Sequence, residues 1–535
     1  MGTGGRFAFF GLTILGAAVG LAAAVGIASA QTVSAYGDDT KKAECDDPLC
    51  VCLDEKSIEA CTQVIDKRWS APVRAAAFRA RAEAYGTAGK YDLAIRDLDQ
   101  AIQMVPEPSA VTYNLRGQTY GMKGDYDRAI QDFTQAIQYT PIFAAAYYNR
   151  GQTYAAKGLY DLAIKDFSEA ISLNPKYLLA YEKRGDAYYA KKNSSRALAD
   201  YSEAISISPN YAHAYNARGT VYALQGDYDH ALNDYSYAIK LAPTSPDFYL
   251  SRALLTADHA DSELVVADLD EAIRLDPQQP DFYLVRGAVR MGVNDDRAQR
   301  DLDAAIKLDP GNLAGIGATA WRLKGRIKYL RGDLAVATQY YDEAVRLDPK
   351  SAPNYVYRGL TWAARGEENR AIRDYTQAIT LQPDANSAYF GRGIAYFGQG
   401  DFVLAAEDFA VPGRDSSELL SVLWRHLAME RAGRKPSKNE LAQAVKDLRP
   451  DTWPAPIFQM FQGQRAPDAV LAAASNARQR CEAQFYAGEW QLLQAARDAA
   501  AEAFNAAVKG CARTSIEFQV AAKELSRVGD QHEGH

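Results

Sequence analysis

Residues 116–149 read RGQTYGMKGDYDRAIQDFTQAIQYTPIFAAAYYN, and this stretch recurs with substitutions along most of the chain. The next copy begins at Arg150 and reads RGQTYAAKGLYDLAIKDFSEAISLNPKYLLAYEK. The opening Arg-Gly pair appears again at Arg184-Gly185 and Arg218-Gly219, so each step is 34 residues. A fixed period of this length predicts a stack of small units that contact their neighbours, not one globular core.

Seven positions of the copy match the pattern of tetratricopeptide repeats. They fall on family positions 4, 8, 11, 20, 24, 27 and 32 and are Tyr113, Gly117, Tyr120, Ala129, Phe133, Ala136 and Pro141. The chain therefore resembles the tetratricopeptide family, whose units are pairs of antiparallel helices. The resemblance implies an all-α fold: a right-handed superhelical solenoid of about ten helix pairs, followed by a C-terminal helical cap region.

Ten copies occupy residues 75–412. Their position-7 residues are Arg81, Arg116, Arg150, Arg184, Arg218, Arg252, Arg286, Lys324, Arg358 and Arg392. The spacing slips most at residues 311–318, where five residues are added, three glycines among them; we predict a bend there. Pro412 stands where the second helix of the tenth copy needs a small residue, and it ends the array.

Residues 1–30 have the pattern of a secretory signal peptide. One basic residue, Arg6, precedes an apolar run that ends in the cleavage-like Ala28-Ser29-Ala30. The alternative is an uncleaved anchor formed by residues 7–29, because such a run is just long enough to span a bilayer. Either interpretation predicts export, to the periplasm of a bacterial envelope or beyond the cell.

Residues 31–74 are interpreted as a linker followed by a Cys-rich half-repeat cap. The segment DEKSIEACTQVID (54–66) imitates the second helix of a repeat, and we expect no first helix before it. A bridge between Cys52 and Cys61 would tie down the short segment that replaces that helix. A metal site is the rival interpretation, but the spacing lacks the paired cysteines and nearby histidine of zinc sites. The pairing of Cys45 and Cys50 stays open.

Residues 413–535 depart from the repeat pattern and are expected to be helical. The runs WPAPIFQMFQG and CEAQFYAGEW, with a later Cys511, resemble the C-terminal part of NlpI-like tetratricopeptide proteins of the bacterial envelope. No Cys precedes Cys45, so the lipid attachment site of a lipoprotein is missing. Cys481 and Cys511 flank a predicted antiparallel helix pair, and its geometry would place them side by side for a disulfide.

An Arg at position 7 is followed sixteen residues later by an Asp in nearly every copy. Among the pairs are Arg116 with Asp132, Arg150 with Asp166, Arg184 with Asp200, and Arg218 with Asp234. The copy that loses the Arg, at Lys324, also loses the Asp, having Tyr340. Joint loss predicts a structural ion pair that fixes the packing of the two helices.

The family resemblance implies a groove lined by positions 2, 5, 9, 12 and 13 of each first helix. The polar residues carried over include Tyr148, Gln152, Glu182, Asp186, Tyr189, His213 and Asn216. In copies 6–10 we expect a continuous apolar strip of Leu250, Leu254, Leu284, Met291, Val356, Leu360, Phe390, Ile394 and Phe397. Such a strip should be covered, either by a partner helix or by the chain's own residues 415–470.

The charge balance and the motifs narrow the function. A net charge of −7 argues against nucleic acid, and no catalytic motif, metal-ligand cluster or cofactor fingerprint is recognised. We expect a non-enzymatic scaffold that binds protein or peptide partners in the groove; the NlpI resemblance suggests cell-wall hydrolases or a protease. The alternatives are a self-assembling structural protein, with the groove filled by a second copy, and, less favoured, a hydrolase.

Overall fold

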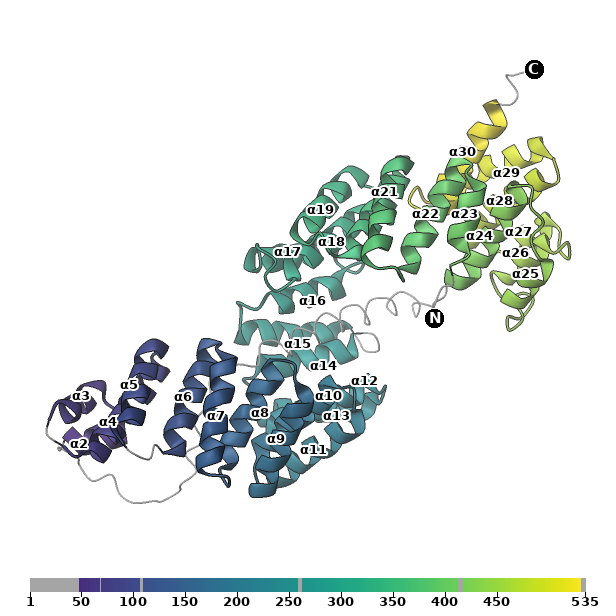
Figure 1. Cartoon of the computed structure of the whole chain (residues 1–535). Coiled ribbons are helices and arrows are strands. Elements are labelled where there is room, and N and C mark those ends of the chain that lie inside the picture. Colours follow the sequence, from purple (N-terminus) through teal and green to yellow (C-terminus); the bar gives the residue numbers. More distant parts are fainter. Residues whose placement is uncertain (1–47, 68, 106–108, 258–261, 412–416, 531–535) are drawn as a thin grey trace. The chain divides into compact units, whose positions relative to one another are not determined.

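The computed structural model describes residues 48–67, 69–105, 109–257, 262–411 and 417–530 (Figure 1). The predicted signal segment, the linker, Cys45 and Pro412 lie outside these ranges. Within them every regular element is a helix, as the resemblance predicts. None of these helices combines the length and apolarity needed to cross a bilayer. The chain divides into two compact units, unit 1 up to Leu275 and unit 2 from Asp276 onward.

Unit 1 contains a short N-terminal helix pair and six repeat pairs. The N-terminal pair is α2 (Pro48–Glu55) and α3 (Ile58–Asp66). The repeat pairs are α4 (Ala71–Thr87) with α5 (Tyr91–Met104), α6 (Ala110–Lys123) with α7 (Tyr126–Tyr139), α8 (Ala144–Ala156) with α9 (Tyr160–Leu173), α10 (Leu178–Ala190) with α11 (Ser194–Ile207), α12 (Ala212–Leu224) with α13 (Tyr228–Leu241), and α14 (Pro246–Thr256) with α15 (Ser262–Leu275).

Helix α2 corrects the expectation that no helix precedes the half-repeat. It packs on α3 and on α4, and Cys52 is fully buried there together with Cys61. The two Sγ atoms lie 2.21 Å apart, at disulfide distance. The PLCVCLDE run is too short to show a helical period, so the sequence alone did not reveal α2.

Close packing within most pairs depends on a glycine at position 8, which faces an aromatic ring at position 24 in repeats 2–5 and 8–10. A Cβ added to Gly117 would lie only 2.8 Å from the Phe133 ring, and one added to Gly185 would lie 2.7 Å from the Tyr201 ring. A larger residue opposite such a ring would therefore force the helices apart. This contact fixes the pairing that the 34-residue period predicts.

Unit 2 contains four repeat pairs and seven further helices. The pairs are α16 (Pro280–Arg290) with α17 (Asp295–Leu308), α18 (Ile316–Leu330) with α19 (Leu334–Leu347), α20 (Ala352–Ala364) with α21 (Glu368–Leu381), and α22 (Asn386–Gln399) with the short α23 (Phe402–Phe409). The further helices are α24 (Ser417–Arg431), α25 (Lys438–Ala444), α26 (Ala455–Phe461), α27 (Pro467–Ala473), α28 (Ala477–Leu493), α29 (Arg497–Gly510) and α30 (Ile516–Asp530).

Helices α28 and α29 form an eleventh pair with the packing of the repeats. A Cβ on Gly488 would lie 2.6 Å from the Phe504 ring, the same glycine-to-ring contact at the same spacing of sixteen residues. Ala500 and Ala507 are fully buried at the positions of Ala129 and Ala136. The Sγ atoms of Cys481 and Cys511 lie 2.07 Å apart and join the start of α28 to the end of α29.

The insertion at residues 311–318 forms a closed cap on α18. The Asp309 carboxylate accepts hydrogen bonds from the backbone N–H groups of Ile316 at 3.0 Å and Gly317 at 3.1 Å. A Cβ on Gly317 would lie 2.5 Å from the Asp309 carbonyl oxygen, so this position requires glycine. Helices α17 and α18 pack directly on each other, and the bend itself stays a prediction.

Candidate functional site

The position-7 arginines pair with the predicted aspartates in nine of the ten repeats. In repeat 2, Arg116 donates from Nε to Asp132 Oδ2 at 2.8 Å and from Nη2 to Oδ1 at 2.7 Å. The same two-point contact joins Arg81 to Asp97, Arg150 to Asp166, Arg184 to Asp200, Arg218 to Asp234, Arg252 to Asp268, Arg286 to Asp301, Arg358 to Asp374, and Arg392 to Asp408.

The same guanidinium also reaches the preceding repeat, which the sequence did not reveal. Arg150 Nη1 donates to Thr134 Oγ1 and Arg184 Nη1 donates to Ser168 Oγ, both at 3.0 Å. Each acceptor stands sixteen residues before the arginine, so the signal was present as a recurring Ser, Thr or Asp. One residue thus fixes a helix pair and its stacking on the previous pair, which is a structural role.

Repeat 8 replaces this contact with a different one. Lys324 Nζ donates to Asp303 of the preceding repeat at 2.5 Å and lies 4.8 Å from the centroid of the Trp321 ring and 4.7 Å from that of Tyr340. Asp303 is largely exposed. Because repeat 8 lacks both the Arg and the Asp of the ladder, no ladder aspartate is left without its arginine between the two helices of this repeat.

A tyrosine–carboxylate cluster lies around α10 in unit 1; it consists of Glu182, Lys183 and Asp186 of α10, Tyr201 of α11, and Tyr211, which directly precedes α12. Tyr211 OH donates to Glu182 Oε2 at 2.7 Å, and Tyr201 OH donates to Asp186 Oδ1 at 2.8 Å. Lys183 Nζ donates to Asp186 Oδ2 at 2.9 Å and to Glu182 Oε1 at 3.4 Å. Because every member is hydrogen-bonded to another member, the cluster is held in one geometry, although the Asp186 side chain keeps 42 % of its surface exposed.

The protonation states within this cluster follow from burial and charge. Burial lowers the pKa of Lys183, but Asp186 and Glu182 outweigh it and hold that pKa above its usual value. Burial and the same carboxylates raise the pKa of Tyr201 and Tyr211. At neutral pH the lysine is charged and both phenols are donors, so the cluster carries one net negative charge.

The cluster depends on residues that the sequence did not single out. Tyr201 stands at position 24, where repeats 2 and 3 have Phe133 and Phe167, and its extra hydroxyl is what reaches Asp186. Tyr235 does the same in the next repeat, donating to Thr220 Oγ1 at 3.1 Å. The Phe-to-Tyr change at this position was the available signal.

Aromatic rings extend the cluster on both sides. Tyr148 is buried, with its ring centroid 5.0 Å from that of Tyr177, and it accepts a hydrogen bond from Gln152 Nε2 at 2.9 Å. On the other side the exposed His213 lies 5.7 Å from Tyr211 and 5.3 Å from Phe248, measured between ring centroids. Together with the cluster, these residues make a polar and aromatic surface.

The remaining predicted groove residues of unit 1 are half-buried. They are Tyr189, Asn216, Leu250 and Leu254. Burial raises the pKa of Tyr189, so it too is a neutral donor. The Oδ1 atom of Asn216 is buried without a hydrogen-bond partner among the described residues. It is an unused acceptor on the same surface.

Phe397 was predicted to bind a partner, and this is wrong. It is fully buried in the core of unit 2, with its ring centroid 5.1 Å from that of Trp424 on α24. Ile394 and Leu284 are each 6 % exposed, and Phe390 packs against the same core as Phe397. Met291 is half-buried at the end of α16.

The predicted segment, residues 415–470, supplies only part of what covers the groove residues of the last repeats. Helix α24 lies within residues 415–470, but α30 also lies against α22 (Figure 1). Tyr329 OH donates to the Thr514 carbonyl at 2.9 Å, and Arg527 Nη2 donates to the Gly398 carbonyl. Residues 514–527 therefore occupy groove positions 12 and 13 of repeats 8 and 10.

The apolar strip is also not continuous, because repeat 8 interrupts it. Positions 5 and 9 of that repeat are Arg322 and Arg326, between Leu284 in repeat 7 and Val356 and Leu360 in repeat 9. The predicted strip did not take these two arginines into account. They place two basic residues between the apolar residues of repeats 7 and 9.

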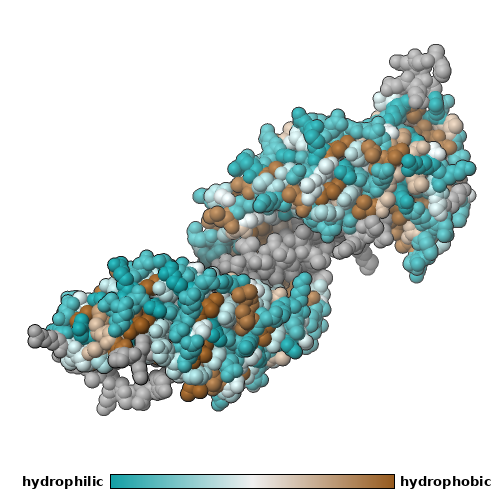
Figure 2. Space-filling model, in the orientation of Figure 1, coloured by the Kyte–Doolittle hydropathy of each residue, from teal (hydrophilic) through white to brown (hydrophobic). Residues whose placement is uncertain are grey.

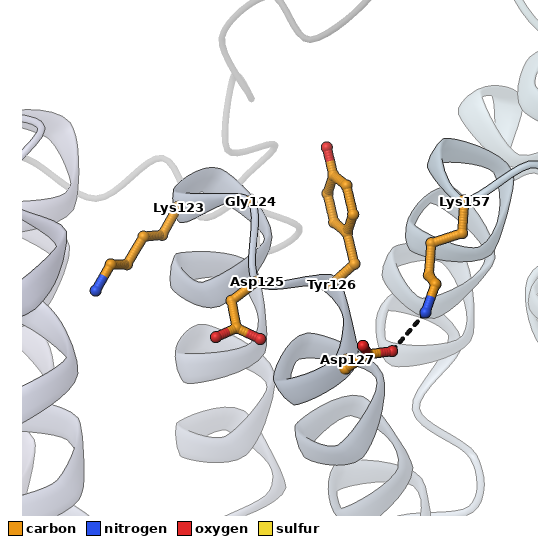
Figure 3. Close-up of a pocket in the computed structure, with 6 residues that line it drawn as sticks. All are labelled: Lys123, Gly124, Asp125, Tyr126, Asp127 and Lys157. Carbon is orange, nitrogen blue, oxygen red and sulfur yellow. Dashed lines mark hydrogen bonds and ion pairs between the residues drawn. The ribbon is translucent and has the colours of Figure 1, made fainter.

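A polar notch of about 380 Å³ lies between the turns of repeats 2 and 3 (Figure 3). Its lining includes Tyr126 and the pair in which Lys157 donates to Asp127. The same contact joins Lys123 to Asp92 one repeat earlier and Lys191 to Asp161 one repeat later. The polar lining of the notch thus belongs to a contact that recurs between successive repeats.

Hydrophilic side chains dominate the face shown in Figure 2, with hydrophobic ones scattered among them. The most exposed large apolar residues are Leu313 at 98 %, Ile142 at 77 % and Val293 at 74 %, and each lies in a different turn. No group of His, Cys, Asp and Glu within the described ranges is arranged to hold a metal ion.

Family models match stretches in both units. A tetratricopeptide repeat model matches residues 144–177 and 212–245, a second, described as TPR repeat, matches 117–158, 185–226 and 359–400, and a third, again tetratricopeptide repeat, matches 296–352. The chain therefore contains tetratricopeptide repeats. The matches lie between residues 117 and 400 and do not extend into residues 413–535.

Three solved structures align with parts of this chain. A tetratricopeptide repeat protein from Parabacteroides merdae is 18 % identical over 45 % of this chain and 97 % of its own, with a TM-score of 0.39. Yeast Tom70 is 17 % identical over 86 % of this chain and 96 % of its own, with a TM-score of 0.34. MamA is 28 % identical over 30 % of this chain and 93 % of its own, with a TM-score of 0.28.

Proposed function

We propose that this tetratricopeptide-repeat chain is an exported scaffold that holds other envelope proteins on its first-helix faces. The observation that supports this most is the tyrosine–carboxylate cluster of unit 1. It is rigid in the free chain, so a partner would not bear the cost of ordering it. It offers aromatic surface, acceptors and donors together, which is the composition typical of protein-binding surfaces.

The proposed location rests on the amino terminus and the cysteines. Residues 1–30 carry the signal pattern, and the Cys52–Cys61 and Cys481–Cys511 contacts suit an oxidising compartment. The NlpI resemblance of residues 413–535 makes cell-wall hydrolases and a protease the first partners to test. N-terminal sequencing of the protein from its host should begin at Gln31, and a cytosolic full-length chain would contradict export.

Site-specific photo-crosslinking tests the binding surface. A photoreactive amino acid at the exposed His213 should crosslink to another envelope protein in living cells. The control position is Leu159, which is 44 % exposed in the turn before α9. Equal products from both positions, or none from His213, would refute the proposed surface, and a product made of two copies of this chain would favour self-assembly.

A further inference from the structure

Helix α30 meets repeats 8–10 through a stripe of polar side chains. Gln519, Lys523 and Arg527 stand four residues apart, so they lie on one side of the helix. Gln519 Nε2 donates at 3.4 Å to the Thr514 carbonyl, the oxygen that also accepts from Tyr329 of repeat 8. Each further turn of α30 reaches the next repeat along the array.

Lys523 and Arg527 make charged contacts with repeats 9 and 10. Lys523 Nζ forms an ion pair with Glu368 Oε1 at the start of α21, and the Glu368 side chain is only 16 % exposed. Arg527 Nη2 donates to the carbonyls of Phe397, at 3.4 Å, and Gly398 in the last turn of α22. A carboxylate favours a cation at the first place, and the negative end of a helix favours one at the second.

Helix α22 leaves room for the lysine side chain. A Cβ on Gly398 would lie 2.8 Å from Lys523 Nζ and 3.2 Å from its Cδ, so glycine at position 13 leaves the space into which this side chain extends. Repeats 2, 5 and 8 have Met122, Leu224 and Leu330 at the same position. A side chain of that size on α22 would occupy the space that Lys523 fills.

An apolar stripe on the same helix packs against the core of unit 2. Val520 and Ala521 are buried in that core, and Leu525 packs against it. A helix that takes the place of α30 would therefore need an apolar stripe beside its basic one. Together the two stripes define an amphipathic helix with two basic residues one turn apart.

The buried charges of unit 2 tolerate the departure of α30. Arg431 donates to Glu524 of α30 and to Glu489 of α28, both at 2.8 Å, so two carboxylates share one guanidinium. Burial, followed by the nearby Glu524, raises the pKa of Glu489 to about 8. When α30 leaves, Glu524 enters water and Arg431 keeps Glu489 as a one-to-one pair. Residues 511–515 connect α30 to α29, so its release requires no repeat to unfold.

We infer that α30 is a resident ligand of the first-helix face of repeats 8–10, and that a partner protein binds this face in its place with an amphipathic helix. The partner helix presents two basic residues four positions apart, which replace Lys523 and Arg527 at Glu368 and at the C-terminal end of α22. In the free chain α30 inhibits binding at this face. This inference rests on the proposed function and adds the chemistry of a partner.

A peptide with the sequence of residues 514–530 tests the face in the full chain. The amidated peptide carries fluorescein at its N-terminus and competes with α30, and its binding is followed by anisotropy. Lys523→Ala with Arg527→Ala in the chain weakens only the resident helix, so this double variant should bind the peptide about 10-fold more tightly than the unchanged chain does. A peptide that carries the same two alanines should lose the gain.

The dependence on Glu368 identifies the place of binding. Glu368→Lys, added to the double variant, should weaken peptide binding at least about 10-fold. Lys523→Glu in the peptide should then restore part of the loss. Binding that is indifferent to Glu368 would overturn the inference.

The control variant removes the same charge from positions before α30. Lys509→Ala with Arg513→Ala deletes two exposed basic residues and should leave peptide binding at the level of the unchanged chain. A gain equal to that of the variant at Lys523 and Arg527 would show a response to net charge alone and would overturn the inference.

Hydrogen exchange of the unchanged chain gives a readout that needs no variant. The amides of α30 should exchange at least about 10-fold faster than those of α22 and α28, because α30 opens by itself. Equal protection of the three helices would make α30 a permanent part of the core and would overturn the inference.

Light scattering tests a second copy of this chain as the occupant. The unchanged chain should be a monomer, and a dimer that is lost on changing Lys523 and Arg527 to alanine would assign the face to a second copy and overturn the inference. Crosslinking at His213 would in either case still support the proposed function.

Discussion

The two units share the same type of helix pair, but the charged side chains on the faces of their first helices differ in their hydrogen bonding. In unit 1, Lys183 lies between two carboxylates that also accept hydrogen bonds from Tyr201 and Tyr211. In unit 2, Arg322 has an Nε with no acceptor among the described residues. Positions 8, 20, 24 and 27 fix the packing, so positions 5 and 9 are free to carry different charges. The repeat therefore sets the fold, and the face residues set what binds.

The units also differ in how buried charge is used. Arg431 on α24 donates to Glu489 Oε2 and to Glu524 Oε2, both at 2.8 Å, and both glutamates are fully buried. This three-residue group joins α24, α28 and α30, and thus holds in place the helix that lies against α22. Unit 1 has fewer charges at such depth, because its ladder aspartates keep a slight exposure.

The largest expected effect is that of Arg431→Leu. Removing the cation leaves the buried Glu489 without its partner and leaves Glu524 paired with Arg527 alone, which should destabilise unit 2 by about 3–5 kcal/mol. Five of the six tryptophans lie in unit 2, so tryptophan fluorescence during urea unfolding reports mainly on that unit. Arg128→Leu, which removes an exposed ion pair with Asp125 in unit 1, is the control and should shift nothing measurable.

The stability of unit 2 measured over a series of pH values tests its buried charges in a second way. Burial, with Glu524 nearby, raises the pKa of Glu489 from 4.5 to about 8. Between these two values the folded chain binds a proton that the unfolded chain does not, so the stability of unit 2 falls as pH rises. The loss should be on the order of 3 kcal/mol between pH 5 and pH 8. Glu489→Gln should flatten the profile, and a profile unchanged by that variant would contradict the assignment.

The Arg–Asp ladder gives an effect of intermediate size. Arg184→Ala strands Asp200, which is 5 % exposed, and should cost unit 1 about 2–3 kcal/mol. The double change with Asp200→Ala should cost less than the sum of the two single changes. In unit 2, Lys324→Ala leaves an exposed Asp303 and should cost about 1 kcal/mol or less. Denaturation monitored by hydrogen exchange separates the units; strictly additive effects at Arg184 and Asp200 would show that the pair is not coupled.

The sequence predicted the parts of the fold that repeat. The period, the ten helix pairs and the spacing of sixteen between Arg and Asp are local regularities, and they recur in the structure as helix pairs with two-point ion contacts. The pair α28 with α29 was predicted as an antiparallel helix pair but was not counted among the copies of the repeat, because Ala487 and Ala503 stand where the Arg and Asp would be. Gly488 and Phe504 make the glycine-to-ring contact of the repeats, but this pair lacks the Arg–Asp ion pair.

What the sequence could not show depends on contacts between distant residues. The cover over Phe397 involves Trp424 and α30, and Arg527 meets Gly398 across about 130 residues. Glu489 and Glu524 look like surface residues in any helical pattern, yet both are buried because Arg431, which is distant in sequence, pairs with both of them and Arg527 pairs with Glu524 as well. The sequence did not single out Arg322 for another reason. The groove positions of the repeats before and after it are apolar, so the pattern indicated a continuous apolar strip.

The smallest predicted effect compares two tyrosines at the same repeat position. Tyr201 in unit 1 donates its hydroxyl to Asp186, whereas the Tyr341 hydroxyl in unit 2 has no hydrogen bond to any residue that the structure describes. Tyr201→Phe should therefore cost about 1 kcal/mol, since the buried Tyr201 loses a hydrogen bond to a charged acceptor, while Tyr341→Phe should be nearly neutral. Both changes keep the ring that fills the space beside Gly185 or Gly325, so packing is held constant and only the hydroxyl is tested. Equal losses in chemical denaturation would mean that the ring position, and not the hydrogen bond to the face, decides stability, and the contrast between a satisfied face in unit 1 and an unsatisfied one in unit 2 would then lose its energetic basis.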